Sequence, residues 1–257
     1  MTKNILKGIT KDYAIRHKLM DCLKSFRGAH GDNKDEKVKN LTEQFEAIAT
    51  RMIYGGHFEV IGGGEIVRQI YIHTVEFYYH EESNDKNDNN AVHDYIVYHR
   101  NALKGEDKYQ KTVVPFPVGS LNAHQSGIDI TFEDPHGNYR ASALIRAFMV
   151  KEGWNEESDF FDDFPNNKKK GDTVNPRSTY LYDYLFQNAI LPVSIVWRDT
   201  PIKSNVTLVP NKRENVYKYE EDPSTRKVKI EKGKPKKKIV DGKKIPDDRH
   251  WAFSKDK

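Results

Sequence analysis

The sequence is poor in cysteine and contains no long apolar run. Its one cysteine among 257 residues, Cys22, cannot form a disulfide within the chain, as is typical of proteins from reducing compartments. No apolar stretch reaches the roughly 20 residues that a membrane-spanning helix needs. The polar segment 1–9 lacks the apolar centre of a signal peptide. We therefore expect a cytoplasmic protein that does not enter a membrane. We also expect a monomer.

Several catalytic and cofactor-binding motifs are also missing. The sequence contains no HExxH, no CxxC pair, no phosphate-binding loop, no nucleophile elbow and no dinucleotide fingerprint. The run Gly62-Gly63-Gly64 lies between two predicted strands, so we interpret it as a hairpin turn. We expect neither a cofactor nor a resident metal ion.

The charged residues are unevenly distributed. Residues 211–244 contain thirteen Lys and Arg against six acidic residues, an excess of seven positive charges in a chain whose net charge is +4. The rest of the chain is therefore net negative, with acidic patches at Glu81–Asp94 and Glu152–Asp163. The basic segment predicts binding to nucleic-acid phosphates, and a solvated tail or a lysine-rich hairpin without such a role is the alternative. The expected backbone contacts are Lys234, Lys236, Lys237 and Lys238.

The aromatic content of 11% excludes a disordered chain, and the hydrophobic periodicity changes along the sequence. Helical spacing predicts helices at Asp12–Phe26, Leu41–Met52 and Thr179–Ala189. Strands are predicted at His57–Ile61, Ile66–Tyr79, Ala91–His99, Val113–Val118, Gly127–Glu133, Tyr139–Val150 and Leu191–Trp197.

This order of elements predicts an α+β fold. We expect a single mixed domain with a largely antiparallel curved sheet flanked by helices. An N-terminal helical extension (1–38), the core (39–210) and a basic C-terminal segment (211–257) would follow one another along the chain.

Glu76 is the residue that stands out in the predicted strand 66–79. Alternation places it on the same face as Ile72 and Tyr78, where a carboxylate is costly unless it is paired or functional. One interpretation is an ion pair with Arg68 or Arg146. The other is a carboxylate that activates water.

Four short motifs in order resemble the alkyladenine DNA glycosylase family, over about residues 41–200. The family's Thr-Glu-Ala-Tyr-like strand corresponds to the run 72–79, and its Ala-x-His motif to Asn90-Ala-Val-His93. Its Gly-Thr-Leu segment is similar to Gly119-Ser120-Leu121, and its Leu-Leu-Arg-Ala segment to Leu144-Ile145-Arg146-Ala147. A Gly-Pro-led helix of the family is loosely similar to Asn175-Pro176 with the predicted helix after it.

The resemblance implies removal of a damaged, alkylated purine that is flipped out of DNA. Glu76 would then activate water and Arg146 would lie near that water. Tyr78 would stack on the base, His93 would face it, and His124 would line the pocket. The chain departs from the family between residues 119 and 130, where the family's tyrosines, including one that wedges into DNA, are missing. The substrate is therefore left open between duplex DNA, single strands, RNA and a nucleoside.

Two alternatives from other classes remain. The first is a non-catalytic nucleic-acid-binding protein on the same scaffold, in which the basic segment provides most of the affinity. The second is a metal-dependent nuclease that uses His93, Asp129 and nearby carboxylates. The histidine spacing favours it only weakly, because His73 and His80 are seven residues apart and lie on opposite faces of a strand.

Overall fold

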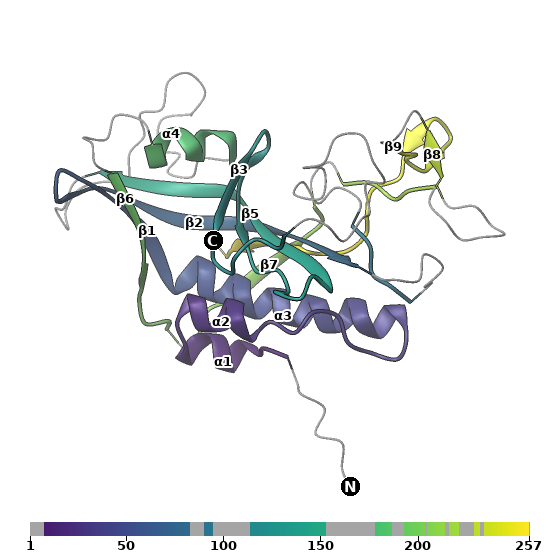
Figure 1. Cartoon of the computed structure of the whole chain (residues 1–257), viewed down its shortest axis with the longest axis horizontal. Coiled ribbons are helices and arrows are strands. Elements are labelled where there is room, and N and C mark those ends of the chain that lie inside the picture. Colours follow the sequence, from purple (N-terminus) through teal and green to yellow (C-terminus); the bar gives the residue numbers. More distant parts are fainter. Residues whose placement is uncertain are drawn as a thin grey trace, which may run out of the picture.

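The computed structural model describes residues 8–82, 90–94, 114–152, 178–186, 193–203, 205–213, 216–220, 229–231 and 234–256. Helices cover a curved antiparallel sheet, and a small lobe of short strands lies at one end of the molecule (Figure 1). The α+β class predicted from the sequence is therefore confirmed.

The described helices are α1 (Lys11–Arg16), α2 (Leu19–Ser25), α3 (Lys34–Tyr54), the short 3-10 helix η2 (Ser178–Tyr180) and α4 (Leu181–Phe186). The main sheet consists of β1 (Gly56–Gly62), β2 (Glu65–Glu81), β3 (Leu121–His124), β4 (Gly127–Thr131), β5 (Tyr139–Glu152), β6 (Val193–Asp199), β7 (Leu208–Asn211) and β12 (Ala252–Lys255). Two short ribbons, β8 (Ile230–Glu231) with β9 (Lys234–Pro235) and β10 (Ile239–Val240) with β11 (Lys243–Lys244), lie outside this sheet.

The helix α3 lies along one face of the sheet (Figure 1). It begins after Asn33, whose side-chain oxygen accepts a hydrogen bond from the Glu36 amide at 3.0 Å. Its large, fully buried apolar residues recur every three or four positions, which gives the helix one apolar side. They include Leu41, Phe45, Ile48 and Met52.

The single helix predicted at Asp12–Phe26 is wrong, because the chain forms α1 and α2 there. His17 and Lys18 between them are extended, with ψ of 160° and 159°. The second helix starts where the Leu19 amide donates a hydrogen bond to the Asp199 carboxylate at 2.8 Å. This partner comes from the distant strand β6, so helical periodicity could not reveal the break.

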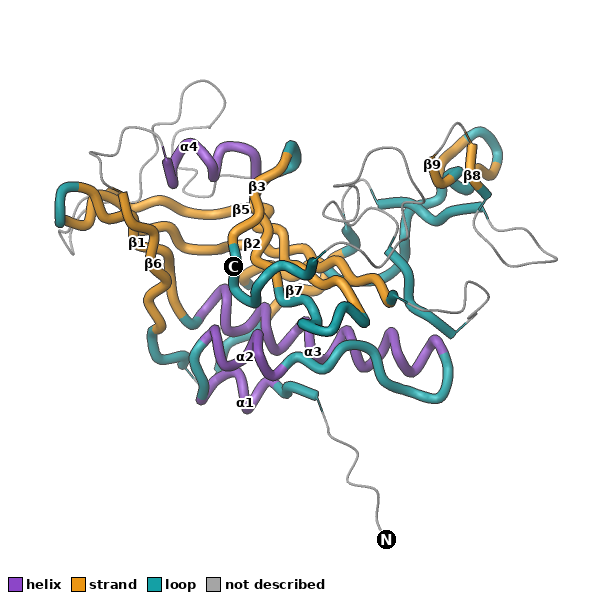
Figure 2. Tube along the Cα trace, in the orientation of Figure 1, coloured by secondary structure: helices purple, strands orange, loops and turns teal. Residues whose placement is uncertain are grey.

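The long strands β2 and β5 form the centre of the sheet, whose order is β3-β4-β5-β2-β1-β6 (Figure 2). One edge of β2 pairs with β5, and its other edge is shared by two strands. β1 pairs with the first part of β2, with Phe58 opposite Ile70. β12 pairs with the later part, with Ala252 opposite Glu76, and it also pairs with β7. All these pairings are antiparallel.

The glycine run forms the turn between β1 and β2, as predicted. Gly63 and Gly64 both have positive φ, of 63° and 89°. Residues with side chains are strained in this region, so the two glycines permit a tight connection between the strands.

The main core fills the space between the sheet and α3. Phe45 of α3 stacks on Phe77 of β2, with ring centroids 4.6 Å apart. Trp251 packs edge-on against Phe45 at 5.1 Å, and its indole N–H donates a hydrogen bond to Thr42 Oγ1 at 2.9 Å. Trp251 is fully buried, so the segment after residue 210 contributes to the core as well as to the small lobe.

The structure also differs from the predicted strands. Residues 114–117 form no strand, because Pro115 and Pro117 have no N–H group to donate to a neighbouring strand. The strands β3, β7 and β12 were not predicted. Residues 91–94 form no strand, and the remainder of the segment predicted at Ala91–His99 lies outside the described residues. So do residues 153–177 and 187–192, which include most of the second acidic patch.

Candidate functional site

Glu76 and Tyr78 lie on the face of β2 that points away from α3. Their neighbour Phe77 stacks on Phe45 of α3, so alternation turns the two polar side chains to the other side of the sheet. Glu76 is only 1% exposed and Tyr78 only 5%. A carboxylate in this position requires compensating partners.

Arg146 and Tyr78 provide those partners. Arg146 lies on β5, and its Nε donates to Glu76 Oε2 at 2.6 Å while its terminal nitrogen donates to Oε1 at 3.3 Å. The Tyr78 hydroxyl also donates to Glu76 Oε1. The Arg146 side chain is 19% exposed, so the cluster meets solvent through its guanidinium. Of the two arginines considered from the sequence, Arg146 forms the pair, and Arg68 donates to the Tyr184 carbonyl at 3.1 Å.

Tyr78 acts as a donor in this cluster. Burial, followed by the charge of Glu76, raises the pKa of its phenol well above the ordinary value. The phenol therefore keeps its proton and holds the carboxylate by a hydrogen bond. The guanidinium carbon of Arg213 lies 5.3 Å from the centroid of the Tyr78 ring.

A second polar group lies on the same face, two strands away. Asp129 of β4 is opposite Leu144 of β5, which is in turn opposite Glu76 of β2. Asp129 accepts a hydrogen bond from the Ser142 hydroxyl at 3.1 Å, and His124 Nε2 lies 3.1 Å from its other oxygen. The hairpin of β3 and β4 thus places the predicted base-binding residue His124 on the same sheet face as Glu76.

His93 lies farther along this face. Its ring stacks on His80 of β2, with centroids 4.6 Å apart. The Asp94 amide donates to His80 Nδ1 at 3.2 Å, and the Asp94 carboxylate pairs with Arg213. His93 is therefore joined to Tyr78 through this chain of neighbours, while Tyr78 and Arg146 each contact Glu76 directly.

Arg213 is the centre of a buried cluster that the sequence did not reveal. Its guanidinium pairs with Asp94 and with Asp247, the latter at 3.2 Å. It also donates to the Phe77 carbonyl at 3.1 Å and lies 5.1 Å from the centroid of the Trp251 ring. In the sequence Arg213 is one of thirteen basic residues in a polar segment, and no local pattern distinguishes it from those on the surface.

The described residues from Val216 to Asp247 form the small lobe, which we call the basic lobe. Its short segments are joined by backbone hydrogen bonds, for example from the Lys238 amide to the Lys218 carbonyl at 2.8 Å. Val216 is buried against Tyr78 and Leu144, so the root of the lobe touches the candidate site.

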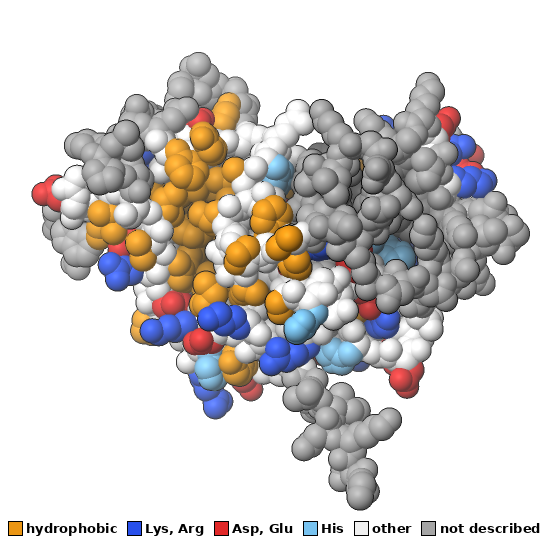
Figure 3. All heavy atoms as spheres, in the orientation of Figure 1, with side chains coloured by type: hydrophobic (Ala, Val, Ile, Leu, Met, Phe, Trp, Pro, Cys, Tyr) orange, Lys and Arg blue, Asp and Glu red, His pale blue; other side chains and the backbone are white. Residues whose placement is uncertain are grey.

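The four lysines predicted to contact a nucleic-acid backbone all belong to this lobe. Lys236 pairs with Glu220 at 3.1 Å, while Lys237 lies 4.4 Å from the centroid of the Tyr217 ring. Lys238 is exposed, and the side chain of Lys234 is outside the described part of the structure. Basic and acidic side chains lie side by side at the end of the molecule that carries β8 and β9 (Figure 3).

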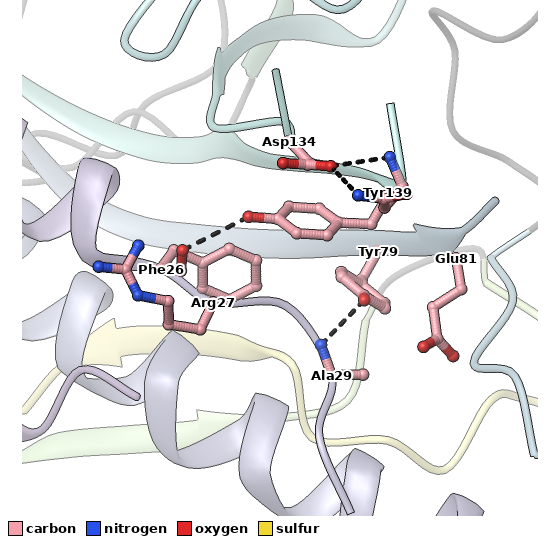
Figure 4. Close-up of a pocket in the computed structure, with 8 residues that line it drawn as sticks. Phe26, Arg27, Ala29, Tyr79, Glu81, Asp134 and Tyr139 are labelled. Carbon is pink, nitrogen blue, oxygen red and sulfur yellow. Dashed lines mark hydrogen bonds between the residues drawn. The ribbon is translucent and has the colours of Figure 1, made fainter. Parts of the chain in front are cut away.

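A cavity of about 310 Å³ lies elsewhere, between the chain after α2 and the ends of β2 and β5 (Figure 4). Tyr79 lines it and faces away from Glu76 and Tyr78. The Tyr79 hydroxyl accepts a hydrogen bond from the Ala29 amide at 2.9 Å, and the Tyr139 hydroxyl donates to the Phe26 carbonyl at 3.4 Å. The polar groups of this cavity are thus satisfied within the protein, and it is separate from the candidate site.

Within the part of the chain that the structure describes, no three His, Cys, Asp or Glu side chains are arranged to hold a metal ion. None of the helices there is long and apolar enough to cross a membrane.

No protein-family model, no curated protein and no solved structure matches the chain.

Proposed function

We propose that the protein hydrolyses the N-glycosidic bond of a flipped, alkylated purine in DNA, using water activated by Glu76. The observation that carries the proposal is the direct contact of Glu76 with both Tyr78 and Arg146. The resemblance nominated Glu76 and Tyr78 from one motif and Arg146 from another, and the fold joins the three in one cluster. The protein would act as a monomer in the cytoplasm, at the nucleoid.

The cluster has the parts that this reaction requires. The transition state resembles a positively charged sugar, which a nearby carboxylate stabilises while it also orients water. Arg146 compensates the charge of Glu76, and the Tyr78 hydroxyl fixes its position. Arg146 is the solvent-facing member of the cluster, so a substrate would approach Glu76 from the side of Arg146. Stacking of a base on Tyr78 stays a prediction, because the Tyr78 ring is buried and would first have to become accessible.

The surroundings of the cluster also support a nucleic-acid substrate. The basic lobe begins at Val216, which packs on Tyr78. His124, held beside Asp129 on the same face, supplies a polar side chain suited to contact a base. The candidate site therefore lies between a basic surface and a hairpin with a polar tip.

One observation favours a second candidate, a non-catalytic nucleic-acid-binding protein on the same scaffold. Both oxygens of Glu76 already accept hydrogen bonds from Arg146 or Tyr78, and the carboxylate is 1% exposed. In this alternative the cluster is a structural ion pair and binding depends on the lysines of the basic lobe.

Base release by the Glu76→Gln variant separates the two candidates. Dimethyl-sulfate-treated duplex DNA is incubated with protein, and free bases are measured by chromatography. Parallel reactions use treated single strands, treated RNA and methylated nucleosides. We expect the parent to release alkylated purines and Glu76→Gln to be slower by about 100-fold or more, with DNA affinity retained.

Glu59→Gln is the matched control. Glu59 is also a buried strand carboxylate, 5% exposed, and Arg198 donates to it at 2.7 Å from the neighbouring strand. This variant should release bases like the parent. The proposal would be abandoned if the parent released no base from any of the substrates, or if the two variants lost activity equally.

A further inference from the structure

Backbone hydrogen bonds between three segments hold the basic lobe together. The Lys218 amide donates to the Ile245 carbonyl at 2.9 Å, the Ile245 amide to Lys238 at 3.0 Å, and the Lys238 amide to Lys218 at 2.8 Å. The three bonds close a ring, in which each segment donates to the next. Because these backbone groups are satisfied within the lobe, the lobe is an ordered frame for its lysine side chains.

Part of the positive charge of the lobe is neutralised inside it. Glu220 accepts a hydrogen bond from Lys229 Nζ at 2.7 Å and lies 3.1 Å from Lys236 Nζ. The bonds from Lys229 and Lys236 lower the pKa of Glu220 below its ordinary value, so the carboxylate stays charged beside both lysines. Lys218 pairs with Asp248 in the same way, at 2.7 Å. These three lysines already have an anionic partner.

Lys237 and Lys244 differ from them, because they gather on one aromatic ring. Their Nζ atoms lie 4.4 and 5.7 Å from the centroid of the Tyr217 ring. Neither lysine forms an ion pair with another residue that the structure describes. Attraction to the ring offsets part of the repulsion between the two ammonium groups and restricts the two long side chains. An anion that contacts both would therefore meet lysines that are already positioned.

The hairpin of β10 and β11 places both lysines on one face. Ile239 is paired with Lys244, so the two side chains point to the same side of the hairpin. Lys237 is two residues before Ile239 and points to that side by alternation. Ile239 is 56% exposed. This face therefore presents an exposed aliphatic side chain beside two ammonium groups.

We propose that Tyr217, Lys237 and Lys244 form a clamp for a phosphate group in the backbone of a nucleic acid. The inference rests on the proposed function and adds to it the place where the backbone is held. Lysine binds phosphate as a point charge, so two lysines on one ring suit a phosphate that continues into sugars on both sides. Ile239 would contact the adjacent sugar. Such a clamp positions the substrate and reads no base sequence.

The clamp lies next to the candidate site. Tyr217 directly follows Val216, which packs against Tyr78. The Tyr78 hydroxyl in turn donates to Glu76. A nucleic acid that is held at Tyr217 would thus lie beside the side chains that the proposed reaction uses.

A membrane is the other source of phosphate groups, and it fits this face less well. Attachment to an anionic bilayer takes a cluster of about four to eight basic residues. This face of the hairpin offers Lys237 and Lys244 with Ile239 beside them. Two positioned charges match one phosphate of a chain better than they match an extended charged surface.

The test measures binding to an undamaged, fluorescein-labelled DNA duplex by anisotropy, between about 50 and about 200 mM salt. We expect Lys237→Gln with Lys244→Gln to make the slope of log affinity against log salt shallower by about 2. Tyr217→Leu keeps both lysines but removes the ring, so it should leave the slope unchanged and weaken binding by about two- to fivefold. Tyr217→Phe keeps the ring and should bind like the parent.

Lys229→Gln with Lys236→Gln is the matched control. It removes the same charge from the same lobe, but from lysines that Glu220 already holds, so the slope should change by less than about 0.5. The inference is overturned if both lysine pairs change the slope equally or if Tyr217→Leu binds like Tyr217→Phe. It is also overturned if the parent does not bind the duplex, or binds phosphatidylglycerol vesicles more tightly.

Base release is measured separately, so the two proposals can fail independently. A protein that shows the expected lysine and ring effects but releases no base retains the clamp and loses the proposed function. A protein that releases bases, and in which the two lysine pairs act equally, retains the function and loses the clamp.

Discussion

Arg213 lies over the ring of Tyr78, with its guanidinium carbon 5.3 Å from the ring centroid. Arg213 comes from the segment that enters the basic lobe, and Tyr78 lies beside Glu76. Arg213 is fully buried and pairs with two carboxylates, so this contact fixes the position of the lobe relative to the sheet. The arrangement of Glu76 and the lysine-rich surface is therefore a property of the folded core.

The two partners of the Glu76–Arg146 pair should differ in their effects on stability. Arg146→Met leaves a carboxylate buried without its charge partner, and we expect it to lower the free energy of unfolding by about 3 to 5 kcal/mol. Glu76→Gln leaves a partly exposed guanidinium, which should cost about 2 kcal/mol. Urea unfolding of both variants and of Glu76→Leu/Arg146→Met measures these values. The double variant should be more stable than Arg146→Met alone, and the opposite order would contradict a buried ion pair.

Asp247 should make the stability depend on pH in the acid range. Burial by itself raises the pKa of its carboxyl, but the hydrogen bonds and charge of Arg249, with the charge of Arg213, lower that pKa to about 2. A lowered pKa stabilises the fold above the ordinary value near 4, and this stabilisation is lost as the pH falls toward 2. The parent should therefore lose about 2 kcal/mol more than Asp247→Asn between about pH 5 and about pH 2. Urea unfolding at several pH values checks this.

Asp248→Asn is the control for that experiment, because Asp248 is exposed and pairs with the exposed Lys218. Its acid unfolding should closely follow that of the parent. An Asp247→Asn protein with the parent's full pH dependence would show that other carboxylates are responsible.

Cys22 should be inert in the folded protein. The side chain is fully buried on α2, and burial raises the pKa of its thiol to about 12. A disulfide reagent such as Ellman's reagent at about pH 8 should modify no thiol until the protein unfolds, and one thiol per chain in urea. Rapid modification under native conditions would contradict the packing of α2 against α3.

Trp251 should be essential for stability. Replacement with alanine removes a fully buried indole packed against Phe45, and we expect a loss of about 3 to 5 kcal/mol in the free energy of unfolding. Val240→Ala, on the exposed hairpin, should change it by less than about 0.5 kcal/mol. Urea unfolding of the two variants compares them, and equal midpoints would show that the segment is not part of the core.

Patterns among neighbouring residues predicted those helices, strands and turns that depend on these residues alone. Alternation in β2 separated Glu76 from Phe77, and the glycine run located the turn between β1 and β2. The apolar spacing of α3 also predicted that helix, although it begins at Lys34, earlier than its apolar residues indicate. These features depend on neighbouring residues, which the sequence shows directly.

Features that depend on distant partners were not predictable in this way. The four-residue strand β12 exists because Ala252 pairs with Glu76, and the break before α2 because Asp199 accepts from Leu19. The choice of Arg146 over Arg68 as the partner of Glu76 also required the register of β2 with β5. Arg213 was counted as surface charge, since nothing nearby in the sequence indicates its burial.

The pairing of β12 with β2 also affects how the chain folds during its synthesis. The edge of β2 beside Glu76 has no partner until residues 252–255 have left the ribosome. Trp251, which closes the core against α3, emerges at the same late stage. Until then an open strand edge and an unfilled apolar core are exposed together, which is the combination that invites aggregation or chaperone binding. The sheet that holds Glu76 is thus completed only after residues 252–255 have been synthesised.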